Sequence, residues 1–469
     1  MIRPVVLWTD ALLYLLVVVV LVIIFYARRQ PHLRAPWRLV FSRRLASASA
    51  VILLAYVLIG LLDSLHYRLP LRDNGGGGEV HYAVEVLSVL DYLLGPVRTQ
   101  TEKTYSAPMA TRLYTREAVQ QANGVQTREY PRLEYGGRRL RDPECDFRPD
   151  VLRRAATALL ETALVSSLLL AWMARRQAHR CQRPLREVLR ESLPGHRAPP
   201  CVVIWITVSV LLLLFFLAVN FAAAYHVFGT DKVGQDVFYQ SLKSIRTGLV
   251  IGTLTTLIML PFAILMGIMA GYARGWIDDV IQYLYTTLNS IPHVLLIAAA
   301  ILMLQVYIAN HPEQFETTVE RADIRLLFLC IILGITSWTG LCRLLRGEAL
   351  KLRESEYIQA AVSYGASHAR IVSQHILPNV MHVVLITVVL DFSGLVLAEA
   401  VLSYVGVGVD PTMNSWGNMI NSARLEMARE PVVWWSLLSA FLLMFALVLA
   451  ANLFSDAVRD AFDPRLHER

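Results

Sequence analysis

The sequence predicts an all-α, polytopic membrane protein, and three observations support this fold class. Hydrophobic residues make up 55% of the 469 residues, and the mean hydropathy is +0.47. About nine apolar segments approach the roughly 20 residues that a helix needs to cross about 30 Å of hydrocarbon. Lys and Arg gather in short segments beside these apolar runs, as the positive-inside rule describes. We therefore expect a multi-pass membrane protein in contact with lipid.

The expected spans follow one another along the whole chain. They lie near 5–26, 46–62, 153–173, 201–224, 247–272, 283–306, 326–342, 381–402 and 433–453. The first apolar run ends at Tyr26-Ala-Arg-Arg29 without a small-x-small cleavage pattern. This run is therefore interpreted as a retained anchor and not as a signal peptide.

The distribution of basic residues predicts the orientation. Lys and Arg are dense in 27–45 and in 174–199, so both segments are expected in the cytoplasm. Counting across the spans then places the N-terminus outside, and 343–380 and the C-terminus in the cytoplasm. The net charge of +7 reflects this bias. The Arg clusters lie beside spans without an RNA- or DNA-binding motif, so no nucleic-acid partner is expected.

The chain divides into four parts. Residues 1–62 are expected to form a transmembrane hairpin, 63–152 an extracytoplasmic insert, and 153–200 an extra transmembrane helix followed by a basic cytoplasmic loop. The remaining part, 201–469, contains the last six spans and the cytoplasmic loop 343–380.

The insert opens with a flexible Gly-rich joint at 73–78. Apolar residues at three- and four-residue steps predict a helix over 84–94, and a second helix is expected over 111–121. The stretch 130–141 contains Pro and a Gly-Gly pair and is predicted to be irregular. Two interpretations stay open for this insert: a partly ordered cap, and a docking platform for an extracytoplasmic partner.

A short polar segment, 356–378, separates two long apolar runs. Ala361 and Gly365 are four residues apart and should stack on one helical face, while Glu356 and Ala360 stack on a neighbouring face. A surface of Ala and Gly lets another subunit approach the backbone closely. The charge of Glu356 suits the start of a helix and can meet a basic partner.

The same segment continues with Ile371, Leu377 and Pro378. Pro378 is expected to stop the helix and to set the angle at which the next span begins. An ordinary surface loop is the plain alternative, and the combined spacing argues against it.

Several ordered stretches then carry a resemblance to a known family. They are Glu356 to Pro378, Phe228 to Asp236, Gly271 to Trp276 with Asp278, Leu397 to Gly408 with Ser415 to Asn418, and Asp456 to Arg465. With these motifs, residues from about 201 to 465 resemble the dipeptide, oligopeptide and nickel permease family of binding-protein-dependent ABC importers, second permease type. The chain has Gln235 where the family usually has Arg, and residues 1–200 lie outside the resemblance.

The resemblance implies a type I importer permease core, formed by the last six spans, in the bacterial inner membrane. It implies four kinds of partner: a second permease subunit, like or unlike this chain, two ABC ATPase subunits, an extracytoplasmic solute-binding protein, and lipid. ATP and Mg²⁺ would then be bound by the ATPases. The chain has no GxxxxGK[ST] phosphate loop of its own, so no catalytic residue, cofactor or metal is expected on it. The implied cargo is a di- or oligopeptide.

The resemblance also implies roles for particular residues. The ATPase-coupling loop would use Glu356, Ala360, Ala361, Gly365, Ile371, Leu377 and Pro378. The family's outside-loop motif corresponds to Gly229, Thr230, Asp231, Gly234 and Asp236.

Physical chemistry gives these motifs an interpretation of their own. The stretch from Gly229 to Asp231 forms a polar turn, and Asp236 is placed to cap the following helix, which is favoured over metal or substrate binding. Lys243 and Arg246 interrupt apolar residues after that turn, which predicts an interfacial helix leading into a span.

Other polar and small residues lie within the spans. Gly267 and Gly271 fit the small-xxx-small pattern of close helix packing. Asp391 and Glu399 are candidate pathway residues, because ionisable groups inside a membrane are costly; for Glu399 a structural pairing is the alternative. Histidines and cysteines show no metal-ligand or CxxC spacing.

Two other functions compete with an importer permease. An ion-gradient-driven secondary transporter should show two matching halves with broken helices, and no such repeat is found. A membrane-anchored sensor or assembly factor that works through 63–152 would leave the 356–378 segment without a role.

Overall fold

The computed structural model describes residues 3–70, 82–120, 126–181, 200–311, 313 and 317–462. Within them, nine helical segments are long and apolar enough to cross a membrane, which confirms the predicted fold class. The long helices are α1 (Trp8–Arg29), α3 (Arg44–Ser64), α6 (Phe147–Cys181), α8 (Pro200–Ala222), α9 (Val237–Ala273), α11 (His293–Asn310), α12 (Thr318–Arg353), α15 (Leu377–Tyr404) and α17 (Trp435–Phe462).

Shorter elements connect these helices. The helical ones are α2 (Pro31–Ser42), α4 (Val89–Leu93), α5 (Gly95–Thr99), α10 (Trp276–Ser290), α13 (Glu356–Ser363), α14 (His368–Ile371), the π-helical turn Val372–Ile376 and α16 (Trp416–Glu426). The strands are β1 (Arg3–Val5), β2 (His66–Arg68), β3 (Leu87–Ser88), β4 (Glu117–Gln120) and β5 (Gln126–Glu129). An antiparallel sheet in the order β1-β2-β3 pairs Arg3 with Arg68 and His66 with Ser88, and β4 and β5 form a separate hairpin.

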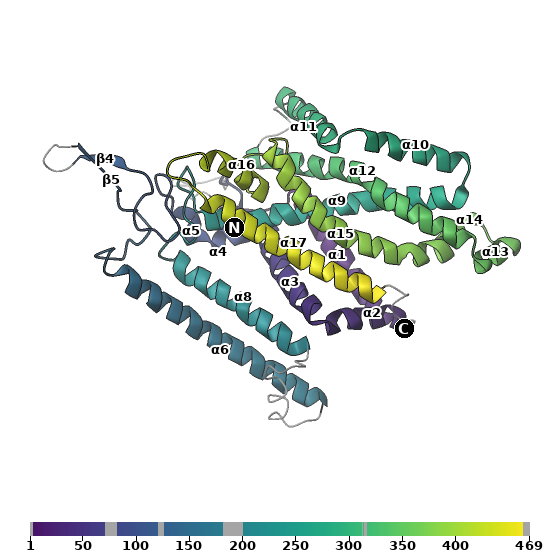
Figure 1. Ribbon diagram of the computed structural model, residues 1–469, viewed down its shortest axis with the longest axis horizontal. Helices are drawn as coiled ribbons and strands as arrows, with labels where there is room; N and C mark the ends of the chain where they lie inside the picture. Colours follow the sequence, from purple (N-terminus) through teal and green to yellow (C-terminus); the bar gives the residue numbers. More distant parts are fainter. Residues whose placement is uncertain are drawn as a thin grey trace, which may run out of the picture.

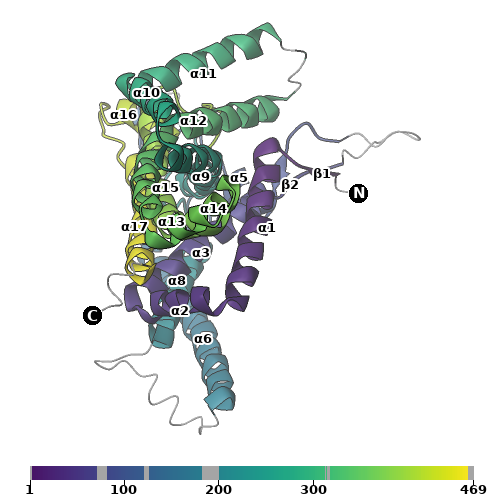
Figure 2. The same cartoon turned by 90° about the vertical axis from the view of Figure 1, so that its right-hand side faces the viewer.

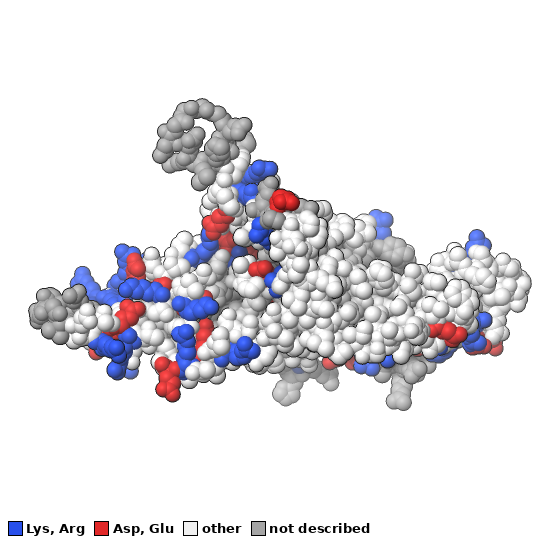
Figure 3. Space-filling view, turned by 90° about the horizontal axis from the view of Figure 1, so that it is seen from above, with Lys and Arg blue, Asp and Glu red and all other residues white. Residues whose placement is uncertain are grey.

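The long helices lie side by side and define two ends of the molecule (Figure 1). One end carries the described part of the insert, including the β4–β5 hairpin, and we call it the insert end. The opposite end carries α13 and α14, and we call it the α13 end. In the space-filling view, a largely uncharged stretch separates charged side chains gathered towards the insert end from a smaller charged group at the other end (Figure 3).

Helix α9 lies at the centre because its small residues let α12 approach. A Cβ added at Gly267 would meet the Cys342 carbonyl oxygen at 2.9 Å, and one at Gly271 would meet the Arg346 carbonyl oxygen at 2.6 Å. Real Cβ atoms do not approach other atoms that closely, so side chains at these positions would force the helices apart. The predicted small-xxx-small contact is thereby confirmed.

The N-terminal extension packs into the same bundle. Helix α3 contacts α9 and α17, and α1 runs beside α9 and α12 (Figure 2). The Tyr56 hydroxyl donates to the Leu443 carbonyl at 2.9 Å. A Cβ at Gly60 would meet Leu249 Cδ1 at 2.6 Å. Residues of the extension therefore share one core with the last six spans.

The insert differs from the sequence prediction at two places. The helix expected over 84–94 is reduced to α4, because Ser88 and Asp91 form a capping box that starts the helix at Val89. The helix expected over 111–121 is wrong for the described residues 111–120. Bends and an isolated bridge between Arg112 and Arg132 lead into strand β4, and Leu113 N–H donates to the Pro131 carbonyl before that strand begins. Backbone pairing within the β4–β5 hairpin outweighed local helix propensity there. The stretch 130–141 is irregular, as predicted, and the Gly-rich joint at 73–78 lies outside the described residues.

Two predictions about the spans also need correction. The segment 283–306 is not one continuous helix, because α10 ends at Ser290 and α11 starts after Pro292, which lacks the N–H that a continuing helix would need. The helix that starts at Val237 is not a separate interfacial helix. It is the first part of the 37-residue α9, where Arg246 is only 6% exposed.

Candidate coupling segment and the junction with the insert

The 356–378 segment forms a short helix with a defined stop. Helix α13 ends in a Schellman motif, in which Ala366 N–H donates to the Ala361 carbonyl at 3.0 Å and Gly365 N–H to the Val362 carbonyl at 2.9 Å. Gly365 has φ +77°, a left-handed conformation that costs other residues about 1–2 kcal/mol. Gly365 is therefore needed to end the helix, and the prediction that it stacks on a helical face is wrong.

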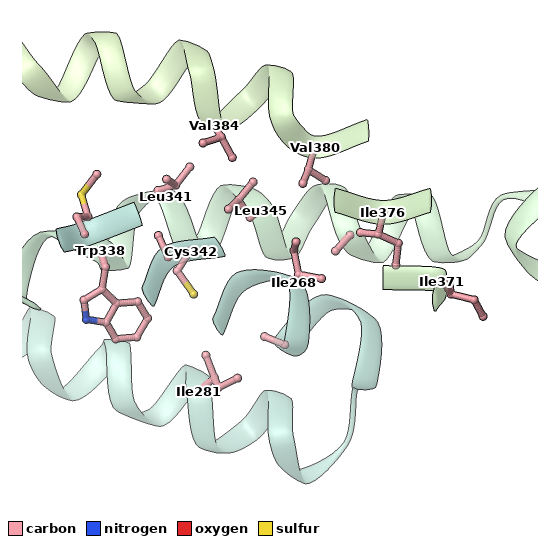
Figure 4. Close-up of a cluster of buried hydrophobic side chains, with 14 of the residues drawn as sticks. Ile268, Ile281, Trp338, Leu341, Cys342, Leu345, Ile371, Ile376, Val380 and Val384 are labelled. Carbon is pink, nitrogen blue, oxygen red and sulfur yellow. The ribbon is translucent and has the colours of Figure 1, made fainter. Parts of the chain in front are cut away.

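Three isoleucines anchor this segment. Ile358, Ile371 and Ile376 are at most 1% exposed. They belong to a cluster that includes Leu345 of α12 and Val380 of α15, shown with further residues of α9 and α10 in Figure 4. Burying one such side chain contributes about 1.5–3 kcal/mol. A movement of α13 therefore cannot occur without moving the ends of the long helices.

The opposite face of the segment is exposed. Glu356, Ala360 and Gly365 are exposed, and Tyr364 is 92% exposed. Ala361 instead packs partly against the isoleucine cluster, so the expectation that it faces a partner needs correction. This short segment is therefore anchored on one side and exposes Glu, Ala and Tyr on the other, which is a surface suited to contact with another subunit.

Pro378 does not end a helix. It lies in the first turn of α15, where a missing N–H is tolerated, and α14, the π-helical turn and α15 follow one another without a break. Leu377 is partly buried against the same isoleucine cluster. The helix is interrupted earlier, between Ser363 and His368, because Gly365 terminates α13.

Polar contacts join the region of the α9–α10 turn to α12 and to this segment. Arg346 makes a two-pronged ion pair with Asp278 at 2.6 and 2.7 Å. Arg353 donates to the Tyr272 carbonyl at 2.8 Å, and the Tyr272 hydroxyl lies 2.7 Å from His368 Nδ1. Sequence reasoning found the motif around Asp278 but not its partners.

At the insert end, the 229–236 motif forms the predicted turn and cap. Asp231 Oδ1 accepts hydrogen bonds from Val233 N–H and Gln235 N–H, both at 2.9 Å. Asp236 caps α9 by accepting from Phe238 N–H at 2.8 Å, which confirms its capping role. Among the described residues, no group of three or more His, Cys, Asp or Glu could hold a metal ion.

The insert lies directly on this motif. Cβ atoms added at Gly229 and Gly234 would collide with the carbonyl oxygens of Ser106 and Glu102, respectively. Both glycines also have positive φ. The Thr230 hydroxyl accepts from Ser106 N–H at 2.7 Å. The two glycines thus serve close backbone contact with the insert, for which the sequence offered no signal.

A buried histidine links the two parts electrostatically. His226 Nδ1 lies 2.8 Å from Asp236 Oδ2, and Nε2 lies 3.4 Å from Glu102 Oε1 of the insert. Burial alone would lower the pKa of His226, but the two carboxylates overcome this and raise the pKa to about 9. Burial would raise the pKa of Glu102, but His226 and the backbone N–H groups of residues 134–136 lower the pKa to about 2. At neutral pH the three groups therefore form a charged, net anionic cluster.

A second charged network ties the extension to the core. Arg246 of α9 pairs with Asp10 of α1 at 2.7 Å, and Lys243 pairs with Asp91 at 2.9 Å. Asp323 of α12 accepts from the backbone and side chain of Thr9. Charges at matching depth in apolar segments could have indicated these pairs, but the linear sequence does not show which spans are neighbours.

The two candidate pathway carboxylates lie in different settings. Glu399 is 1% exposed and accepts from the Ser403 hydroxyl at 2.8 Å, which supports its structural interpretation. Asp391 is partly exposed and has no hydrogen bond or ion pair to a residue that the structure describes.

Comparisons with known proteins agree with this arrangement. The family described as binding-protein-dependent transport system inner membrane component matches residues 263–468. The oligopeptide transport system permease protein OppC of Haemophilus influenzae is 31% identical over 241 residues, which cover 51% of this chain and 71% of that protein. The dipeptide transport system permease protein DppC of Bacillus subtilis is 28% identical over 244 residues, covering 52% and 70%.

A third relative is named for a different cargo. The glutathione transport system permease protein GsiD of Pectobacterium atrosepticum is 31% identical over 241 residues, covering 51% of this chain and 73% of that protein. Each of the three matches covers about half of this chain and 70–73% of the length of the relative. The chain therefore belongs to the family of inner-membrane permease components of binding-protein-dependent ABC importers.

Proposed function

We propose that this chain forms half of the translocation pathway of an ABC importer for short peptides. A second permease subunit completes the pathway, two ATPase subunits bind at the α13 end, and a solute-binding protein delivers cargo at the insert end. Three relatives are named for dipeptide, oligopeptide and glutathione transport, which supports a peptide cargo. ATP and Mg²⁺ are bound by the ATPases.

The observation that carries this proposal is the two-faced α13. Its free face, with Glu356 and Ala360, receives the push of an ATPase, and its isoleucine anchor passes that push to α12 and α15. Closing of the ATPases on ATP then shifts the permease pair between inward and outward openings. Asp391 is the side chain that we assign to the pathway, because it is partly exposed and unpaired among the described residues.

Gly365→Ala tests this role. Alanine at φ +77° costs about 1–2 kcal/mol, which corresponds to roughly a 5- to 30-fold shift between conformations. We expect ATPase association and peptide uptake in proteoliposomes to fall at least about fivefold. Gly347→Ala is the matched control, because an added Cβ there also meets nothing within 4 Å but the backbone is helical.

Ala360→Trp provides a second variant that leaves the helix stop intact, because Ala360 is exposed. This variant should retain the unfolding temperature of the native chain and still lose ATPase association. Normal uptake by both variants would contradict the coupling role and would favour the sensor or assembly-factor alternative.

A further inference from the structure

A strongly basic groove lies at the corner between α1 and α2. Its volume is about 690 Å³, and the lining residues are Arg28, Arg29, Arg34, Ala35, Arg38, Leu39 and Ser42. Four of these side chains are guanidinium groups, and none is acidic. The groove lies near the C-terminal end of α17, because Trp37 packs on Phe462 and Arg43 pairs with Asp460.

Within the part of the chain that the structure describes, no carboxylate balances the positive charge in this groove. Among the described residues, no carboxylate forms an ion pair with any of the four arginines, and the guanidinium of Arg29 lies over the Phe25 ring at 4.3 Å. Other arginines of the bundle do have acidic partners, as in the pairs Arg274–Glu354 and Arg346–Asp278. The positive-inside rule explains why arginines occur near a span. It does not explain why four of them converge on one hollow without a carboxylate.

The surroundings of the groove are apolar. Helix α1 exposes an unbroken run from Val18 to Phe25, with side chains 41–62% exposed, and Leu39 is 44% exposed. The 22 residues of α1 span about 33 Å, close to the roughly 30 Å of a hydrocarbon core. When α1 crosses the membrane, Arg28 and Arg29 therefore lie at the depth of lipid headgroups. Acyl chains can run along the exposed face of α1 below them.

We propose that this groove binds the headgroup of an anionic phospholipid. Guanidinium groups pair with phosphate oxygens through two parallel hydrogen bonds. Four such groups suit a lipid with two phosphodiesters, such as cardiolipin, better than a lipid with one. The volume falls in the range of about 300–1,000 Å³ that is usual for small ligands. The bound lipid holds α2 against the membrane surface and thereby supports the extension where α2 packs on α17.

Lipid retention by the full-length chain in detergent tests the site. The chain is incubated with equal amounts of cardiolipin and phosphatidylcholine, and retained lipids are counted by native mass spectrometry. We expect cardiolipin to be retained preferentially. The double variants R28Q/R29Q and R34Q/R38Q should each lower its retention about threefold, and the combined variant about tenfold. The control R175Q/R176Q removes two exposed arginines near the end of α6 and should change retention by less than about twofold.

Three further measurements test the proposal. They examine the two-pronged contacts, the folding of the variants, and competition by a free anion. Replacing all four arginines by Lys keeps the charge but loses the two-pronged contacts, so retention should be intermediate. Unfolding temperatures of all variants in lipid-free detergent should agree, since these side chains are exposed. Equal losses of cardiolipin retention in the control and groove variants would overturn the proposal. Full displacement of cardiolipin by millimolar inorganic phosphate would also overturn it, because that result would indicate a site for free phosphate. The outcome does not depend on which side of the membrane the groove faces.

Discussion

Individual residues determine how the insert is attached to the segment that precedes α9. Glu102 supplies a carboxylate to His226, and Gly229 and Gly234 leave room for the insert backbone. The histidine charge is stabilised only in the folded chain, because the carboxylates meet it there. A group whose pKa rises on folding stabilises the fold while it is protonated in both states.

This linkage predicts a pH effect of His226→Gln. The native pKa of His226 is about 9, against 6.5 for the unfolded chain. The contribution, on the order of 3 kcal/mol, is complete below about pH 6.5 and is lost as the pH rises through about 9. We therefore expect the variant to lower the unfolding temperature of the purified chain strongly at pH 6 and weakly at pH 10.

The pKa of Glu102 determines how far the pH can fall before the stabilising charge of this carboxylate is lost. Its native pKa is about 2, against 4.5, so this contribution is present above about pH 4.5 and is lost as the pH falls through about 2. The comparison at pH 6 and pH 10 lies outside that range. A variant whose unfolding temperature differed from the native value equally at both pH values would show that His226 acts through packing and not through charge.

At the scale of elements, the contact between α9 and α12 determines how the centre of the bundle is built. Gly267 and Gly271 on α9 face backbone atoms of α12, and the Arg346–Asp278 pair lies at the same end. These contacts connect α9 and the turn after it with α12, which leads into the 356–378 segment. Helix packing and the coupling role are therefore linked.

Gly271→Ala should destabilise this contact. An added Cβ would lie 2.6 Å from both the Ala349 Cβ and the Arg346 carbonyl oxygen, which costs about 1–3 kcal/mol. We expect a lower unfolding temperature in detergent and reduced yield of folded protein. Gly340→Ala is the matched control on α12, because its added Cβ meets nothing within 4 Å. Similar behaviour of the two variants would show that α9 and α12 are not in backbone contact in the membrane.

At the scale of the whole molecule, the proposed coupling role requires the insert end and the α13 end to face opposite sides of the membrane. The proposed orientation puts the N-terminus and the insert outside, and the C-terminus and α13 in the cytoplasm. The chain offers a natural probe, because Cys145 is exposed in the insert, and Cys330 and Cys342 are buried.

Labelling with a membrane-impermeant thiol reagent tests this orientation. In intact spheroplasts, Cys145 should react when the other cysteines have been replaced by Ser. The neighbouring Asp142 raises the pKa of the Cys145 thiol, so the reaction is run at mildly alkaline pH. With Cys145 also replaced, Tyr364→Cys should react only after the membrane is opened. The reverse pattern would place α13 outside and would end the coupling proposal.

The sequence alone determined the features that depend on local composition. Apolar length was sufficient for the fold class and for the spans other than 283–306, because burial in lipid requires about 20 apolar residues whatever their neighbours. The order of short motifs was sufficient for the family. Asp236 could be identified as a cap because capping acts over three residues.

Only the tertiary structure decided which distant residues meet. The role of Gly365 was misread because a left-handed φ is not visible in a spacing pattern. Strand β4 was misread because helix-like spacing does not show its pairing with β5, the other strand of the same hairpin. The pairs Arg246–Asp10 and His226–Glu102 join parts of the chain that the sequence pattern had separated. Burying a charge is favourable only beside its partner, and the identity of that partner depends on how the helices pack.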